Sequence, residues 1–321
     1  MKAQSIILGL LLQLTTNFGW SQTSLIEHYY INNFLINPAI TGIEKYIDIQ
    51  AGYRRQWTHL DGAPANAYLT IHSPFGSKNG KKMGFTHESE ERGSYYSLSN
   101  FRYKNHHGAG LTFRSESIGP FESIELKASY AYHLPLSSRW MLTTGISVGT
   151  IGHQLNQNKV ITSLSDDQLV TGFSNGYSPL LNLGILLYSK SFYLGGSYIK
   201  NPGKIYNRRN YYLISGMRFR DAFQVWTFNP FVIFRNSAGF INFDFGIKAQ
   251  WQSWLWFGAN YRTNKAFSYF TGFNLNPQMG FSILHNIRFK DHTDSNQSTY
   301  EMAVQIRLNN IHQVPCPQEM W

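Results

Sequence analysis

The sequence predicts an all-β protein, a closed antiparallel barrel that spans a membrane. Aromatic residues make up 16% of the 321-residue chain and charged residues only 14%, whereas charged residues reach roughly 25% in an average soluble domain. Beyond the N-terminus no run of 18 or more apolar residues occurs, which excludes a bundle of transmembrane helices. Apolar and polar residues instead alternate along much of the chain. Only a closed barrel lets such strands face lipid without an open sheet edge.

Residues 1–21 have the pattern of a secretory signal peptide. Lys2 gives a basic start, Ser5 to Leu14 form an apolar stretch, and the small residues Gly19 and Ser21 precede the expected cleavage site. The alternatives are a buried helix and a membrane anchor. Export is favoured because the apolar stretch is too short to span a bilayer.

The rest of the chain is expected to divide into an N-terminal arm (22–45), the barrel (46–308) and a C-terminal tail (309–321). The arm is a short helix or an extended segment, and the sequence leaves open whether it plugs the lumen or reaches a partner. Cys316 is the single cysteine, so an internal disulfide is excluded. A barrel closes its own edges and needs no such crosslink. A reactive thiol or a bridge to another chain is the less favoured interpretation of Cys316.

The alternation is clearest between residues 240 and 251, a stretch long enough to cross a bilayer at about 3.3 Å per residue. The apolar face consists of Ile241, Phe243, Phe245, Ile247, Ala249 and Trp251. The polar face consists of Asn242, Asp244, Gly246, Lys248 and Gln250. Side chains that alternate in this way place one face on lipid and the other in the lumen.

Similar runs, separated by turn signals such as Asn-Gly and Asn-Pro, predict about 14 strands. The expected strands are 46–57, 65–72, 109–115, 121–134, 139–150, 178–188, 191–199, 211–220, 223–235, 240–251, 253–262, 265–275, 279–290 and 299–308. An even number places both ends of the barrel sheet on one side of the membrane. Aromatic residues gather near strand ends, as in the girdles that line the two membrane interfaces.

Two longer connections, 75–108 and 151–177, are expected to face the outside of the cell, where partners dock. The alternative is that they are tolerated surface insertions. The formal net charge of +10 does not indicate nucleic acid, because the basic residues are scattered along the chain. Only Lys78 to Lys82 form a small cluster, which we expect to solvate a loop or touch anionic lipid headgroups.

No motif predicts catalysis, a metal site or a cofactor. Gly145 to Gly149 match the hydrolase pattern G-x-S-x-G, but they lie inside an alternating strand with no helix after it, so Ser147 is expected to be a small lumen residue. His106 and His107 are adjacent and should point to opposite faces of a strand. Carboxylates share the polar faces with basic residues, which predicts a charged lumen wall. The pairs are Glu125 with Lys127, Asp244 with Lys248, and Glu301 with Arg307.

Several motifs resemble those of the PorP/SprF family, outer-membrane proteins of the type IX secretion and gliding-motility machinery of Bacteroidetes. Near the start of the mature chain these are Asn37-Pro38-Ala39 with Thr41-Gly42, Tyr53-Arg54-Arg55-Gln56-Trp57, and Gly62-Ala63-Pro64. Further similar stretches are 118–121, 128–136, 192–197, 254–262 and Pro315-Cys316-Pro317. The sequence departs from the family in a longer 75–108 connection and in Ile40, where the family more often has an aromatic residue.

The resemblance implies an outer-membrane location and a non-enzymatic accessory role in export or surface retention of cargo that carries a C-terminal sorting domain. It also implies contact with periplasmic secretion or motor proteins, beside the outer-membrane lipid itself. The candidate partner-binding or structural residues are Asn37, Pro38, Gly42, Tyr53, Arg54, Gln56, Trp57, Gly62 and Pro64. The alternative function is a general porin or solute channel, which needs an open lumen.

Overall fold

The computed structural model describes residues 29, 31–58, 60, 62–76, 104–160, 175–202, 207–223, 225–237, 240–252, 254–289 and 297–310. The predicted signal peptide, the Lys78 to Lys82 cluster and Cys316 lie outside these residues. No helix in the described part of the chain has the length and apolarity to span a bilayer.

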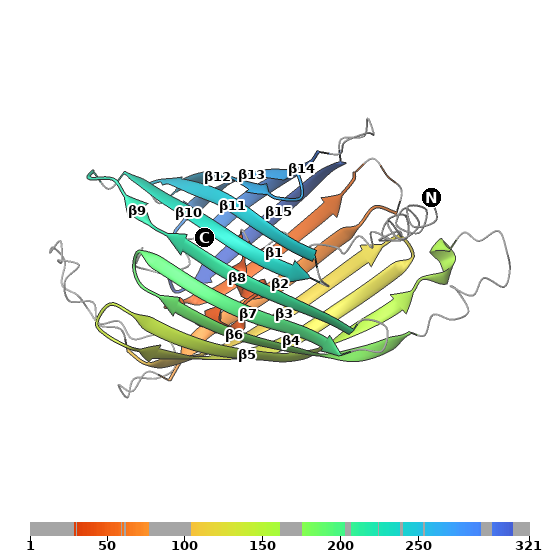
Figure 1. The fold of residues 1–321 in the computed structure, drawn as a ribbon, viewed down its shortest axis with the longest axis horizontal. Helices are drawn as coiled ribbons and strands as arrows, with labels where there is room; N and C mark the ends of the chain where they lie inside the picture. The colour runs from red at the N-terminus through yellow and green to blue at the C-terminus, as the bar shows by residue number, and fades with distance from the viewer. Residues whose placement is uncertain are drawn as a thin grey trace, which may run out of the picture.

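Fourteen strands form a closed antiparallel ring, seen from the side in Figure 1. Their bounds are β1 Ile47–Gln56, β2 Ala65–Phe75, β3 His106–Ile118, β4 Phe121–Pro135, β5 Met141–Leu155, β6 Gly176–Tyr188, β7 Phe192–Pro202, β8 Asn207–Met217, β10 Trp226–Ser237, β11 Phe240–Trp251, β12 Leu255–Arg262, β13 Ala266–Asn276, β14 Met279–Arg288 and β15 Gln297–Leu308. Each strand pairs with its neighbours in sequence, and β1 with β15 closes the ring. The short β9, Phe219–Arg220, pairs with β10 and lies outside the ring.

The predicted fold class is confirmed, and each of the fourteen predicted segments overlaps a strand of the ring. The differences are at strand ends. β5 continues to Leu155, five residues beyond the predicted end, because the long β4 pairs with it along its whole length. The segment predicted as 211–220 is interrupted at Arg218, so β8 ends at Met217 and β9 follows.

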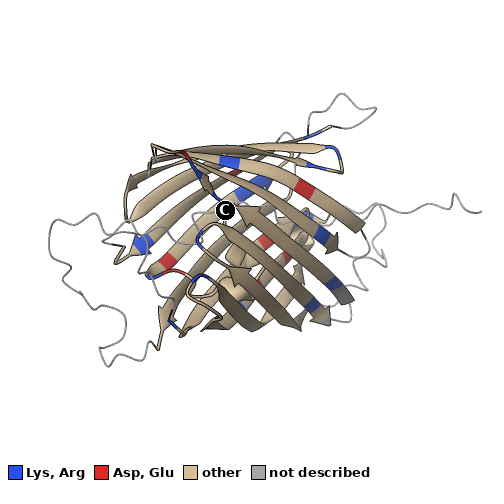
Figure 2. Ribbon diagram, turned by 60° about the vertical axis from the view of Figure 1, so that its left-hand side comes forward, with Lys and Arg blue, Asp and Glu red and all other residues tan. Residues whose placement is uncertain are grey.

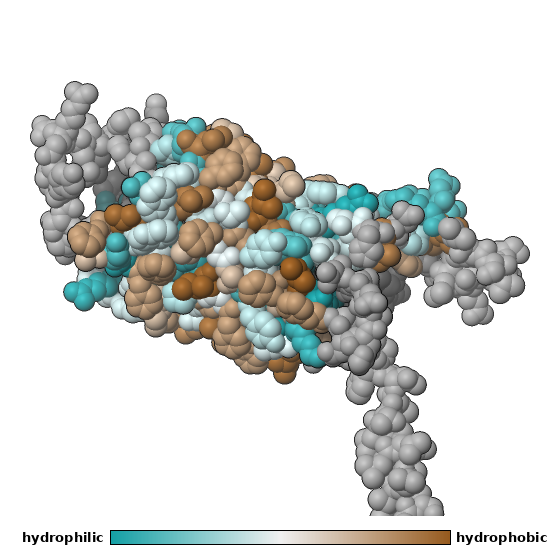
Figure 3. Space-filling model, turned by 90° about the horizontal axis from the view of Figure 1, so that it is seen from above, coloured by the Kyte–Doolittle hydropathy of each residue, from teal (hydrophilic) through white to brown (hydrophobic). Residues whose placement is uncertain are grey.

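Burial along the strands is the reverse of that in a soluble protein. On β11 the side chains of Phe245 and Ile247 are 50% and 48% exposed, whereas Asp244 is fully buried and Lys248 is 7% exposed. Figure 3 shows apolar side chains spread over the barrel wall, and Figure 2 shows charged residues placed within strands. The apolar face therefore points outward, toward lipid, and the polar face points into the lumen, as the alternation predicted.

The N-terminal arm enters the lumen. Two 3-10 turns, η2 (Asn33–Leu35) and η3 (Pro38–Ile40), lie inside the ring before β1 begins (Figure 1). Their apolar side chains pack against inward residues of the wall. The buried cluster includes Tyr29, Phe34, Ile36, Ala39 and Ile40 from the arm, and Met141, Leu186, Ile214, Phe270 and Leu284 from the wall. The sequence left plug and partner contact open, and the described part of the arm is a plug.

The two long connections do not share one end of the barrel, so the expectation that both face outside is wrong. The connection from β2 to β3 joins the end at which β1 starts and β15 stops, which we call the terminal end. The connection from β5 to β6 joins the opposite end. Connections alternate between the two ends of an up-and-down barrel, and this alternation separates them.

The substitution Phe245→Lys tests which face of β11 contacts lipid. Phe245→Lys places a cation at mid-strand on the lipid face, and we expect a loss of about 2–4 kcal/mol in unfolding free energy in bilayers. Ile241→Lys, near the start of the same strand and on the same face, should cost about 0–1 kcal/mol. Urea unfolding of the two variants in lipid vesicles measures the difference. Equal losses would contradict the assigned lipid face.

Candidate functional site

The plug is held by residues of the Asn37 to Gly42 segment. Asn37 caps η3, because its Oδ1 accepts the N–H of Ala39 at 2.9 Å. Its Nδ2 donates to the carbonyl of Ile185 on β6 at 3.3 Å. Pro38 occupies the first position of η3, where its fixed φ and missing N–H suit the start of a helical turn. The Asn-Pro pair thus both shapes the turn and attaches it to the wall.

Three histidines from β2, β3 and β4 bind the backbone at Thr41-Gly42, and we call them the histidine clasp: His72, His106 and His133. His133 Nε2 lies 2.8 Å from the carbonyl of Thr41, and His106 Nε2 lies 3.1 Å from that of Gly42. The N–H of Gly42 donates to His72 Nδ1 at 3.3 Å. Because a carbonyl oxygen only accepts and an N–H only donates, the Nε2 atoms of His133 and His106 are the donors to the turn and His72 Nδ1 is an acceptor.

The clasp requires glycine on both sides of the contact. Gly42 has φ +70°, and a Cβ there would lie 2.5 Å from Gly108 Cα. A Cβ on Gly108 would lie 2.0 Å from the carbonyl oxygen of Thr41. Gly145 and Gly184 admit the backbone of Pro38 and Ala39 in the same way. The wall therefore has a track of glycines along which the plug backbone runs.

The far side of the plug is attached by a buried carboxylate. Asp244 on β11 accepts from Arg262 Nε of β12 at 2.9 Å and from Arg235 Nη2 of β10 at 3.3 Å. The hydroxyl of Tyr29 donates to the same carboxylate and accepts from Arg262 Nη2 at 2.9 Å. Arg235 also lies 5.2 Å from the centre of the Tyr29 ring. The arm is thereby fixed to β10–β12 as well as to β2–β6.

Glu125 and Arg307 are two further lumen charges that neighbouring side chains bind. Glu125 accepts from Arg114 at 2.8 Å and from Lys127 at 2.6 Å, so the expected Glu125–Lys127 pair is present. Arg307 Nη2 donates to Gln305 Oε1 at 2.6 Å and Asn274 Oδ1 at 3.1 Å. Burying a charge costs desolvation free energy, and these hydrogen bonds and ion pairs offset part of that cost.

Ser147 lies within β5, buried in the lumen wall, with its Oγ 2.6 Å from Ser129 Oγ. It lacks the strand-to-helix turn of a hydrolase elbow. His106 and His107 point to opposite faces, since His106 reaches the plug and His107 contacts the outward Tyr130. Among the described residues no group of three or more His, Cys, Asp or Glu is arranged to hold a metal ion.

The other candidate residues lie at the end of β1 and in the connection from β1 to β2. Tyr53 is an outward residue of β1, while Arg54 is buried in the lumen opposite Glu301 of β15 in the strand register. The N–H of Gln56 donates to the carbonyl of Pro64 at 2.9 Å. Trp57 follows β1 with φ +46°, and its N–H donates to Ser298. Gly62, at φ +70°, accepts from the N–H of Gly119.

Sequence reasoning missed the residues that grip the plug. It placed Lys248 beside Asp244, four residues along one strand and thus about 13 Å away along the chain. The observed partners Arg235 and Arg262 come from the neighbouring strands. The clasp residues His72 and His133 also carried no signal in the sequence, because their common partner is a backbone turn.

The comparisons identify the family. A model described as "Type IX secretion system membrane protein PorP/SprF" matches residues 20–306. The chain belongs to the PorP/SprF family. Because this is a membrane family of type IX secretion and the chain is a closed barrel, it is a protein of the bacterial outer membrane with a role in that system. Curated proteins give no match.

Solved structures similar to this PorP/SprF chain are outer-membrane barrels. Omp33 of Acinetobacter baumannii has a TM-score of 0.48 and 8% identity, over 84% of this chain and 100% of that one. The toluene transporter TodX of P. putida has a TM-score of 0.47 and 9% identity, over 87% and 94%. Because both TM-scores are below 0.5, these similarities do not indicate the function of this chain.

Alanine substitutions at two strand glycines test the fit of the plug. Gly108→Ala places a Cβ against the Thr41 carbonyl, and we expect a loss of about 1–3 kcal/mol from overpacking. Gly196→Ala is the matched control, since its Cβ meets nothing nearer than 3.8 Å. The heat-induced shift of the barrel in gel electrophoresis measures both. Equal midpoints would contradict the close approach of plug and wall.

Proposed function

We propose that this barrel is a non-enzymatic accessory of type IX secretion that binds cargo carrying a C-terminal sorting domain and helps its export or retention at the surface. The observation that carries the proposal is the plug. A barrel whose lumen is filled by its own arm is suited to presenting a rigid binding surface. A general porin, the alternative function, needs a water-filled lumen.

The plug is anchored at several independent points, which supports a permanent filling. Asp244 and its two arginines bind Tyr29, the histidine clasp binds Thr41-Gly42, and Asn32 donates to Thr70 of β2 at 2.7 Å. Removing one partner of a buried charge pair commonly costs several kcal/mol. Opening the lumen would break these contacts together, so spontaneous opening is disfavoured.

The two ends of the barrel suit different partners. Short turns occur at both ends, such as 189–191 and 277–278 at the terminal end and 119–120 and 263–265 at the opposite end, but the chain both enters and leaves the ring at the terminal end. We therefore assign the terminal end, with the connection 76–105, to contact with periplasmic secretion or motor proteins. The opposite end, with the connection 156–175, would face the cell exterior.

Within this proposal we assign structural roles to the nine candidate partner-binding or structural residues. Asn37, Pro38 and Gly42 shape and hold the plug, while Gln56, Gly62 and Pro64 form the connection after β1. Tyr53 is an outward residue suited to lipid contact, Trp57 lies at a strand end where interfacial rings are favoured, and Arg54 belongs to the lumen wall. None of these positions is assigned to cargo.

Conductance in planar bilayers tests the docking role against the porin role. The full-length protein should give little steady conductance. The double variant Tyr29→Ala with Gly108→Leu, which removes one anchor and obstructs the clasp, should give larger and more frequent openings. A large steady conductance of the unmodified protein, equal to that of the double variant, would favour the porin.

Co-purification from the native bacterium tests the partner assignment. After mild detergent extraction we expect a protein with a C-terminal sorting domain and periplasmic secretion proteins to accompany the barrel. Trp57→Ala should leave the amount of bound cargo unchanged if Trp57 is structural. Loss of cargo with an intact barrel would instead make Trp57 a binding anchor, and absence of all such partners would contradict the accessory role.

A further inference from the structure

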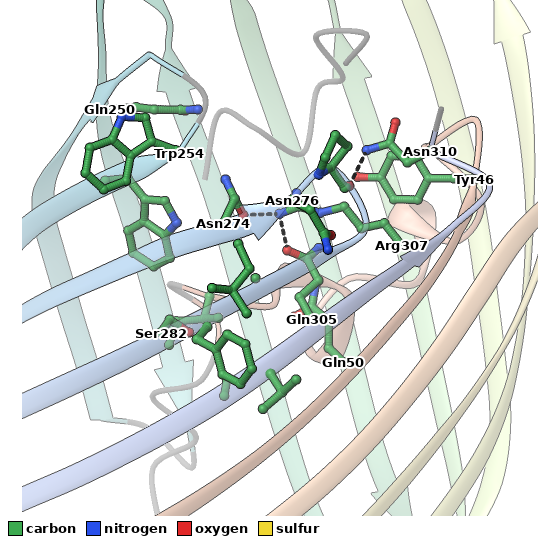
Figure 4. A pocket seen from close by; sticks show the side chains of 18 of the residues that line it. Tyr46, Gln50, Gln250, Trp254, Asn274, Asn276, Ser282, Gln305, Arg307 and Asn310 are labelled. Carbon is green, nitrogen blue, oxygen red and sulfur yellow. Dashed lines mark hydrogen bonds between the residues drawn. The ribbon is translucent and has the colours of Figure 1, made fainter. Parts of the chain in front are cut away.

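A polar cavity of about 280 Å³ opens at the terminal end, between the plug and strands β11–β15. Figure 4 shows its lining side chains converging from β1, from the β11–β12 and β13–β14 turns, and from β15. Six carboxamides line it: Gln50, Gln250, Asn274, Asn276, Gln305 and Asn310. Two tryptophans, Trp254 and Trp256, and two cations, Lys248 and Arg307, also line it, as do Tyr46, Phe281 and Ser282, and no carboxylate is among the described lining residues.

The lining of this cavity includes both hydrogen-bond donors and hydrogen-bond acceptors. The side-chain amino groups of Gln50 and Gln305 both donate to Asp48, at 3.0 and 2.9 Å, which turns their oxygens away from that carboxylate. Gln305 Oε1 accepts from Arg307. Gln50 Oε1 is buried and does not face the open space of the cavity. The carboxamides that face the cavity can both donate to and accept from a ligand, while the two cations favour an acceptor or an anionic group.

The aromatic lining adds a stacking surface. Trp254 is 44% exposed on the β11–β12 turn, at the rim of the cavity. Lys248 Nζ lies 5.1 Å from the centre of the Trp256 ring, which places positive charge against the inner aromatic wall. An exposed indole beside carboxamides that can both donate and accept suits a ring with apolar C–H faces and hydroxyl edges.

We propose that this cavity binds the ring of an acidic saccharide. Hydroxyls bond to the carboxamides that face the cavity, a carboxylate lies toward Arg307 and Lys248, and the ring face stacks on Trp254. The volume is slightly below the range of about 300–1,000 Å³ of drug-sized ligand sites, which suits a ligand as small as one sugar ring. An inorganic anion would pair with the two cations but would offer no ring face to Trp254. A peptide is disfavoured because the surrounding strands are paired on both sides and offer no open edge to its backbone.

This site is independent of the cargo role, and calorimetry with the full-length protein in detergent tests it. Glucuronic acid is the probe, and glucose, inorganic phosphate and triglycine are the comparisons. We expect glucuronic acid to bind with a dissociation constant of about 1 mM and glucose to bind more weakly. Trp254→Ala should weaken glucuronic acid binding about tenfold, and Trp254→Phe by less than about threefold.

Trp140→Ala is the matched control, because Trp140 lies at the same end of the barrel beside Phe192 and does not line the cavity. It should leave binding unchanged, and heat-induced gel shifts check that every variant is folded. The proposal is overturned by a folded protein that does not bind glucuronic acid. It is equally overturned if phosphate or triglycine binds as tightly, or if Trp254→Ala binds the sugar as well as the unmodified protein does.

Discussion

The constraint on which this structure depends is that lipid offers no hydrogen bonds to a polypeptide backbone. Every strand must therefore be paired on both sides, and fourteen strands satisfy this by closing into a ring. Closure places one face of each strand on lipid and the other in an enclosed lumen. The large apolar residues are consequently outside and the charged residues inside, as Phe245 and Asp244 show on adjacent positions of β11.

An enclosed polar lumen creates a second requirement, since its charges are far from bulk water. The arm meets this requirement with matched groups. The Tyr29 hydroxyl joins the Asp244–Arg262 pair, and backbone groups of Thr41-Gly42 complete the histidine clasp. Apolar side chains of η2 and η3 fill the space that remains. The plug thus supplies the interior packing that a soluble domain obtains from its hydrophobic core.

The features that depend on the alternation of apolar and polar residues within one strand could be predicted from the sequence. Strand positions and the lipid face follow from a period of two, which any stretch such as 240–251 carries by itself. The plug could not be derived in this way, because Tyr29 and Asp244 are separated by 215 residues. The placement of the two long connections was also mistaken, because strand order, not loop length, determines the end at which each lies.

The most direct test of the account is a nitroxide scan of β11 in lipid vesicles, at positions 241, 242, 243, 245, 246 and 247. The account predicts high accessibility to dissolved oxygen at 241, 243, 245 and 247, where side chains face lipid, and low accessibility at 242 and 246, where they face the plugged lumen. Equal accessibility on both faces, or the opposite alternation, would contradict it.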